Sequence, residues 1–310
     1  MFEIFLRIVP FFALVALGYW AGRTRFFNEE ATAYLTKFVF YFPLSALIFR
    51  FSSNLTLAEI WNTNLVLGYL CATFAVYLVA AAAALLRGQD IAVSAVEAQC
   101  ATMGNVGFLG IPMLTLLFGA TAIAPIVMAV SIDLVVFSSL IVILITGSRD
   151  GRINAGTLRT VTLGLLRNPM IVAIAAGLAW SALRLPIPGP MASFLDLLSA
   201  AATPGALFAI GASLASKSAE RLSVASWLTF CKLVLHPALV AIALIFLFPV
   251  DGFTAAVVIS AAALPVAGNV FILAQHYGAA PQRASAAILV STILSIFSVS
   301  AIIAAVEPLF

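Results

Sequence analysis

Two stretches of sequence decide the fold of this chain: GNVGFLGIP, residues 104–112, and LPVAGNV, residues 264–270. Each places glycine, proline and asparagine in the middle of a segment that is otherwise apolar enough to be a membrane helix. Within a bilayer, backbone N–H and C=O groups that leave a helix must be paired by protein or by a polar cavity. Two interrupted helices in matching halves of one chain are typical of secondary transporters.

Composition identifies lipid as the main solvent of this protein. Of its 310 residues, 64% are hydrophobic and 9% are charged, and the mean hydropathy is +1.17. A soluble domain has about 25% charged residues, so a soluble fold is excluded. The net charge of +3 is small, and we expect no nucleic-acid partner. Cys71, Cys100 and Cys231 stand alone in apolar segments, so neither a metal site nor a disulfide is expected.

Apolar segments of about 20 residues recur along the chain, each long enough to cross a hydrocarbon core. The first is too long for a signal-peptide core and lacks a cleavage site, so we expect a retained helix. We predict an all-α membrane protein with ten transmembrane helices, near residues 3–22, 31–50, 63–86, 91–118, 121–146, 168–184, 191–215, 223–248, 254–277 and 284–306. Five of them fall in residues 1–146 and five in residues 168–310, with a cytoplasmic linker over 147–167 between them.

Basic residues orient the predicted spans. With the N-terminus outside, ten Lys or Arg residues lie in cytoplasmic loops, against three on the other side, Arg7, Arg50 and Arg184. Because cytoplasmic loops carry the excess of positive charge, we expect both termini outside.

A constant spacing relates the two halves. Pro10 and Pro169, Gly18 and Gly177, Arg25 and Arg184, and Gly119 and Gly278 are all 159 positions apart. Such regularity indicates a duplication. Because each copy holds an odd number of spans, the second copy must be inverted relative to the first.

At this spacing the two interruptions superpose, so we expect them to meet at mid-membrane. A break exposes the N-terminus of a half-helix, which carries a positive partial charge of roughly half an electron and favours anions. The expected substrate-binding residues are Asn105, Gly107, Gly110, Pro112, Pro265, Gly268 and Asn269. The asparagine amides suit either a substrate carboxylate or the freed backbone. A pair of proline kinks satisfied by neighbouring helices remains an open alternative.

A few ionisable residues fall inside the spans, where charge is costly and usually functional. Asp133 lies near the midplane and is the main candidate for coupling to a proton or a sodium ion. A purely structural salt bridge with Lys232 is equally open. Lys232 and His236 share one helix face at i, i+4, and Gln275 lies in the second interrupted helix, which completes the predicted coupling or charge-relay set. Glu97, near the cytoplasmic end of its span, is explained by interface placement.

These residues resemble the auxin efflux carrier family, which includes plant carriers and bacterial permeases for malate and malonate. The resemblance rests on NVGFLGIPML at 105–114, LPVAGNVFILAQHYG at 264–278, Arg167-Asn168-Pro169, and Lys232 with His236-Pro237, and it covers essentially the whole chain. It implies two inverted five-helix repeats, with the fourth and ninth helices crossing. It also implies a scaffold of helices 1, 2, 6 and 7, a transport domain of helices 3–5 and 8–10, and a homodimer formed through the scaffold.

We therefore predict a secondary active transporter in the bacterial inner membrane, not an enzyme. Its expected substrate is a small organic anion, a carboxylate such as malate, malonate or an auxin-like acid, moved by elevator-type alternating access. No cofactor is expected beyond a coupling proton or sodium ion. The runner-up is a sodium-coupled bile-acid-type symporter of the same design. A retinal-type receptor using Lys232 as its Schiff-base lysine, and a passive channel, are weaker alternatives.

Overall fold

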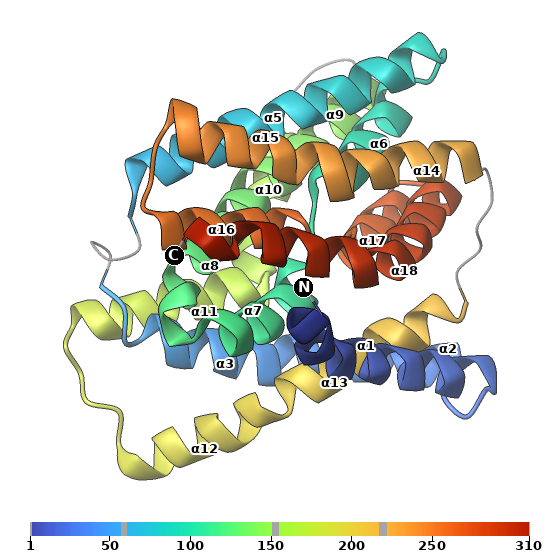
Figure 1. Ribbon diagram of the computed structural model, residues 1–310. Coiled ribbons are helices and arrows are strands. Elements are labelled where there is room, and N and C mark those ends of the chain that lie inside the picture. Colours follow the sequence, from blue (N-terminus) through green and yellow to red (C-terminus); the bar gives the residue numbers. More distant parts are fainter. Residues whose placement is uncertain (1, 57–60, 151–154, 217–221, 310) are drawn as a thin grey trace.

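A computed structural model of the chain describes residues 2–56, 61–150, 155–216 and 222–309. Every named element within these ranges is a helix, and the one backbone pairing of β type is an isolated antiparallel bridge between Gly104 and Val266. The predicted all-α class is thereby confirmed. Figure 1 shows long helices crossing the molecule in layers, with the interrupted ones in its interior.

Six helices form one packed group, in which α1 lies along α13, α3 packs on α11 and α12, and α2 packs on α13. They are α1 (Phe2–Arg23), α2 (Glu29–Tyr41), α3 (Pro43–Ser52), α11 (Pro169–Ala182), α12 (Gly189–Ala200) and α13 (Ala202–Leu214). Pro43 opens α3, because a proline at the first helical position loses no hydrogen bond.

The remaining helices pack mainly on one another. In chain order they are α5 (Thr63–Leu86), α6 (Ile91–Thr102), η1 (Val106–Gly110), α7 (Ile111–Phe118), η2 (Ala120–Ala122), α8 (Ile123–Ile132), η3 (Asp133–Phe137), α9 (Ser138–Asp150), α10 (Ala155–Arg167), α14 (Leu222–Phe230), η4 (Cys231–Leu235), α15 (His236–Ile242), η5 (Ala243–Leu247), α16 (Gly252–Ala262), α17 (Gly268–His276), α18 (Pro281–Val306) and η6 (Glu307–Leu309). The elements η1, η3, η4 and η5 are π-helical turns inside longer helices.

Polar residues begin several of these helices by accepting hydrogen bonds from free N–H groups of the first turn. Asn62 accepts from Leu65 N at 3.0 Å, and Asp90 accepts from Val93 N at 2.7 Å. Asp251 accepts from Thr254 N at 2.9 Å. These N-caps fix where α5, α6 and α16 start.

Six helical stretches of the described residues are long and apolar enough to cross a membrane: 29–52, 63–86, 120–148, 189–214, 222–247 and 281–309. A seventh is a bent pair, Gly156–Arg167 with Pro169–Ala182, at 66°. Val106–Phe118 and Gly252–Ala262 are shorter apolar helices, parts of the two interrupted segments. The total of ten spans stays a prediction. Most of the predicted 147–167 linker is helical, since α9 continues to Asp150 and α10 fills 155–167, while residues 151–154 lie outside the description.

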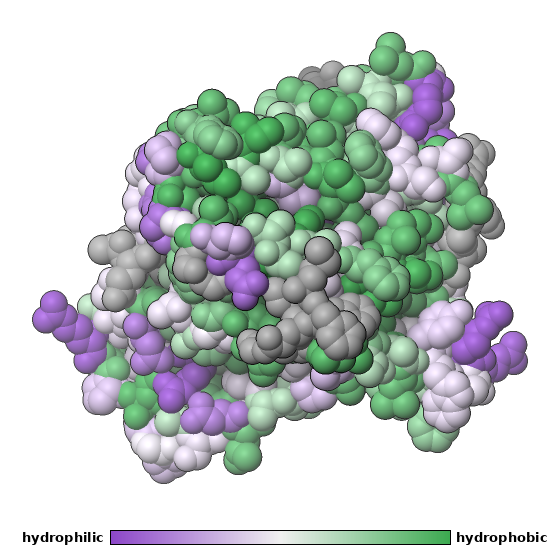
Figure 2. Space-filling model, in the orientation of Figure 1, coloured by the Kyte–Doolittle hydropathy of each residue, from purple (hydrophilic) through white to green (hydrophobic). Residues whose placement is uncertain are grey.

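The exterior is apolar, as lipid contact requires. Figure 2 shows hydrophobic residues over the helices and hydrophilic ones gathered towards the periphery. Leu197, Phe246 and Phe297 are among the large apolar side chains that stay exposed. A soluble monomer rarely exposes apolar patches of this extent, so the surface fits a hydrocarbon solvent.

Close contacts in the two halves repeat at the spacing found in the sequence. A Cβ added to Gly18 of α1 would lie 2.1 Å from the carbonyl oxygen of Phe208, and one added to Gly177 of α11 would lie 3.0 Å from that of Phe49. Phe49 and Phe208 are also 159 positions apart. Each glycine therefore lets a helix approach its neighbour at the equivalent place in each half.

Left-handed backbone recurs at the same spacing. Gly119 and Gly278 have φ of 84° and 59°, and Arg25 and Arg184 have φ of 60° and 52°. Non-glycine residues rarely adopt positive φ. The two halves thus share unusual turns as well as unusual contacts.

Candidate substrate and coupling site

The two interrupted helices meet backbone to backbone in the interior of the protein. Asn105 N donates to Pro265 O at 2.8 Å, and Ala267 N donates to Met103 O at 3.0 Å. On the far side of the second break, Val266 N donates to the Ser291 hydroxyl of α18 at 3.0 Å. Each break therefore satisfies groups that the other exposes, which meets the bilayer's demand that buried backbone be paired.

Small residues let the two breaks fit together. A Cβ on Gly110 would lie 2.6 Å from Leu264 Cδ1, so a larger residue there would have to displace the Leu264 side chain, which packs against the first break. A Cβ on Gly107 would lie 2.8 Å from Met170 Cε of α11, which places the first break against the group that contains α1 and α13. Pro112 is buried in the first turn of α7.

The two predicted asparagines differ in access. Asn105 is buried at 7% exposure, whereas Asn269 and its neighbour Gly268 are exposed. Outside its own helical turn, no atom of the described residues lies within 4 Å of the Cβ position of Gly268. The N-terminus of α17 is therefore open to a ligand on one side of the junction.

Lys232 lies beside this junction and is completely buried. Its Nζ donates to Ala262 O, the last carbonyl of α16, and lies 3.1 Å from His236 Nδ1. A Cβ on Gly104 would lie 3.3 Å from the same Nζ. The ammonium thus occupies the negative end of one half-helix and touches the backbone of the other break.

Asp133 is buried at 5% exposure on η3. The Tyr69 hydroxyl of α5 donates to its Oδ1 at 3.0 Å and to its Oδ2 at 3.2 Å. Within the described parts of the chain, no ion pair joins Asp133 to Lys232. The direct salt bridge that the sequence left open is therefore not formed. Both charges lie on π-helical turns, which frequently occur at functional sites.

Two polar residues of α5 that the sequence analysis missed belong to this cluster. Thr73 Oγ1 lies 3.0 Å from His236 Nε2, and the Tyr69 ring lies 5.9 Å from the His236 ring, centroid to centroid. Their signal in the sequence was two hydroxyl side chains at i, i+4 within an apolar span, which is a weak one.

Gln275 does not join the cluster. It is exposed on α17. Gln99 of α6, by contrast, is fully buried, and the amide N and O of Gln99 have no hydrogen-bond partner among the described residues. Unsatisfied buried amides are costly and often sit beside water or ligands.

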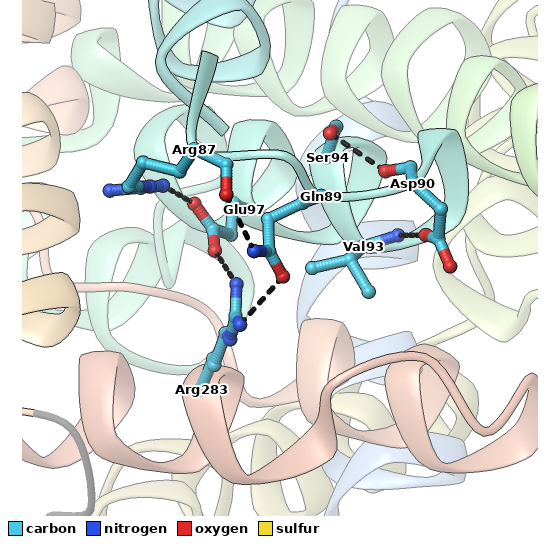
Figure 3. A network of polar contacts seen from close by, with 7 residues as sticks. All are labelled: Arg87, Gln89, Asp90, Val93, Ser94, Glu97 and Arg283. Atoms are coloured by element: carbon cyan, nitrogen blue, oxygen red, sulfur yellow. Dashed lines mark hydrogen bonds and ion pairs between the residues drawn. The ribbon is translucent and has the colours of Figure 1, made fainter. Parts of the chain in front are cut away.

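Glu97 occupies a separate polar cluster at the start of α6, drawn in Figure 3. It is completely buried and accepts from both Arg87 and Arg283, so ion pairing inside the protein accounts for its burial, and its position relative to the membrane interface stays a prediction. Arg283 also donates to Gln89 Oε1 at 2.7 Å. The carboxylate thereby ties α18 to the loop between α5 and α6.

An apolar helical chain with buried charges beside two joined helix breaks has the features of a membrane transport protein. Comparison with known proteins identifies the same class. The family described as "Membrane transport protein" matches residues 3–303, and the chain belongs to that family. The resemblance to auxin efflux carriers and malate or malonate permeases is thus confirmed. A relative from Rhizobium meliloti (strain 1021), described as "Putative malonate transporter", is 30% identical over 309 residues, covering 98% of this chain and 96% of the relative.

Proposed function

We propose that this protein is a secondary active transporter of small organic anions, with malonate as the first candidate substrate. The observation that carries the proposal is the junction of the two interrupted helices, which has the buried Lys232 ammonium beside it and includes the exposed N-terminus of α17. Both features favour negative charge. The name of the relative at 30% identity supports a dicarboxylate.

A dicarboxylate suits this arrangement because it offers one carboxylate to each feature. The first would accept from the Asn269 amide and the free N–H groups of α17, and the second would pair with Lys232 past the half-buried Gly104. A monocarboxylate such as an auxin-like acid would use only one of the two. Malate and malonate are therefore the preferred substrates.

Ten spans in two inverted repeats, the first in residues 1–146 and the second in 168–310, are part of the proposal. The paired contacts of Gly18 with Phe208 and of Gly177 with Phe49 support it, because they join equivalent positions of the two halves. In an inverted repeat the two equivalent breaks enter from opposite membrane faces. The antiparallel bridge at Gly104 agrees with that orientation.

Transport would proceed by an elevator movement. The group of α1–α3 and α11–α13 would be the scaffold and the mediator of a homodimer, and the remaining spans would carry the site. The contact of Gly107 with Met170 lies between the two groups, where small side chains allow sliding. The protein would lie in a bacterial inner membrane with both termini outside, as the distribution of basic residues indicates.

Binding of malonate to the purified protein tests the proposed function. Asn269→Ala removes the exposed amide, and losing a hydrogen bond to a charged ligand costs about 1.5–3 kcal/mol, or roughly 10–100-fold in Kd. Asn54→Ala, an exposed asparagine in the turn after α3, is the control and should bind as the wild type does. Equal affinity in both variants, measured by calorimetry at equal melting temperatures, would contradict the assignment.

A further inference from the structure

A line of buried polar groups connects Asp133 to Lys232 without a direct contact between them. It runs from the Asp133 carboxylate to the Tyr69 hydroxyl, and from Thr73 through the His236 ring to the Lys232 ammonium. Tyr69 and Thr73 lie one helical turn apart on α5, and the Tyr69 ring lies 5.9 Å from the His236 ring, centroid to centroid. All five side chains are buried.

The hydrogen bonds at the two ends of this line have assignable directions. An ammonium has only donors, so Lys232 must donate to His236 Nδ1, which therefore carries no proton. The ring is then neutral with its proton on Nε2, and it donates to Thr73 Oγ1 at 3.0 Å. Tyr69 donates to the carboxylate. The cation is the donor end and Asp133 the acceptor end.

Lys232 also occupies the place where a coupling cation would be bound. Transporters with broken helices hold sodium at unwound carbonyls and at the C-terminal ends of half-helices. Here the last carbonyl of α16, from Ala262, accepts from Lys232 instead. The protein thus carries its own tethered cation at that position.

The net charge of Asp133 and Lys232 links substrate binding to protonation. In the structure, Asp133 and Lys232 together are neutral, and a buried uncompensated charge is strongly unfavourable. When a substrate carboxylate pairs with Lys232, Asp133 loses its compensating charge. The charges of Lys232, Asp133 and that carboxylate balance again if Asp133 takes up one proton from the aqueous phase and becomes the neutral acid while Lys232 stays an ammonium. The second carboxylate stays at the exposed N-terminus of α17.

We propose, on the basis of the proposed function, that Asp133 takes up the coupling proton and that Tyr69 and Thr73 are positioning residues linking it to the substrate at Lys232. Substrate binding is then accompanied by proton uptake and needs no sodium. Tyr69 holds the carboxylate on the line, and Thr73 holds the ring of His236 in the tautomer that accepts from Lys232.

The other titratable groups named here, on the helices around this line, are outside the line. On α6, Glu97 is held by Arg87 and Arg283, the latter from α18. On α5, Tyr77 donates to the Ala95 carbonyl at 3.4 Å. The thiols of Cys100 and Cys231 are buried without a charged hydrogen-bond partner among the described residues.

Calorimetry of potassium malonate binding to the purified full chain tests the proposal. Repeating the titration at one pH in two buffers of different ionisation enthalpy gives the number of protons taken up per malonate. We expect about one in the wild type, by linkage between the two binding events. We expect almost none in Asp133→Asn, Tyr69→Phe and Thr73→Val. Replacing potassium by sodium should leave Kd unchanged.

Tyr77→Phe is the matched control, since it removes a buried hydroxyl from the same helix outside the line. It should keep the wild-type proton count. Tyr69→Phe and Thr73→Val preserve side-chain shape, and their melting temperatures verify folding. The inference is overturned if the wild type takes up no proton, or if Tyr69→Phe and Thr73→Val both keep the wild-type proton count. Tighter malonate binding in sodium than in potassium would also overturn it. If none of malonate, malate and acetate binds, the proposed function itself fails.

Discussion

Substitution of Glu97 by glutamine tests the polar cluster in Figure 3. The carboxylate is completely buried and joins two arginines, Arg283 with 11% of its side chain exposed and Arg87 with 35%. Glutamine has nearly the same shape but no charge, and its amide N–H₂ must point at one of the two guanidinium groups. One arginine then loses its acceptor at residue 97, although Arg283 keeps the Gln89 Oε1 atom.

The expected loss in the free energy of unfolding follows from how exposed each ion pair is. Removing one partner of a buried ion pair costs about 3–5 kcal/mol. Because glutamine keeps one oxygen that can still accept a hydrogen bond, we take about 3 kcal/mol for the Arg283 pair. The Arg87 pair is partly solvated and adds only about 0.5 kcal/mol. The total of about 3.5 kcal/mol corresponds to a fall of roughly 5 °C in melting temperature for a chain of this size.

Thermal unfolding of the purified protein, followed by intrinsic fluorescence, measures this fall. Glu30→Gln, an exposed glutamate in the first turn of α2, is the control and should change little. Malonate affinity should be unchanged in Glu97→Gln, because the cluster lies outside the proposed site. A melting temperature equal to that of the control would refute the reasoning about this buried carboxylate.

Two further predictions concern the group of α1–α3 and α11–α13, and the first uses Gly164 of α10 as a comparison. Gly211→Ala places a Cβ only 1.9 Å from Val15 O, so α1 and α13 must separate, and we expect a clear drop in melting temperature. On α10, a Cβ added to Gly164 meets no atom of the described residues within 4 Å outside its own helical turn, so Gly164→Ala should stabilise the protein by about 0.5–1 kcal/mol through helix propensity. A melting temperature that is higher in Gly211→Ala than in Gly164→Ala would contradict the packing described here. Asp196→Asn removes an exposed ion pair with Arg50 and should cost under about 1 kcal/mol, vanishing at high salt. A larger or salt-independent loss, seen in melts at two ionic strengths, would show that more than this pair is involved.

Local patterns predicted much of the site. Glycine and proline inside apolar segments located both breaks, because these residues interrupt helices wherever they stand. The i, i+4 spacing of Lys232 and His236 predicted that they share one helix face, and the structure places Lys232 Nζ 3.1 Å from His236 Nδ1. The roles assigned to them as a coupling or relay set stay predictions.

Other parts of the site could not be predicted, because they join residues far apart in the chain. Tyr69 lies 64 positions from Asp133, and Thr73 lies 163 from His236. Nothing in an apolar span marks which hydroxyl will face a charge on another helix. The difference in exposure between Asn105 and Asn269 was equally hidden, since each is the middle residue of a Gly-Asn-Val triplet.

The sequence by itself determined the solvent, the helical class and the positions of the two interruptions, since hydropathy and helix-breaking residues act over a few neighbouring positions. Only the tertiary structure decided which exposed backbone groups pair across the junction, and that Asp133 reaches Lys232 through α5 rather than directly. The physical reason is that a hydrogen bond depends on ångström-scale distances between helices. Those distances are set by the packing of the whole bundle and not by any local stretch of the chain.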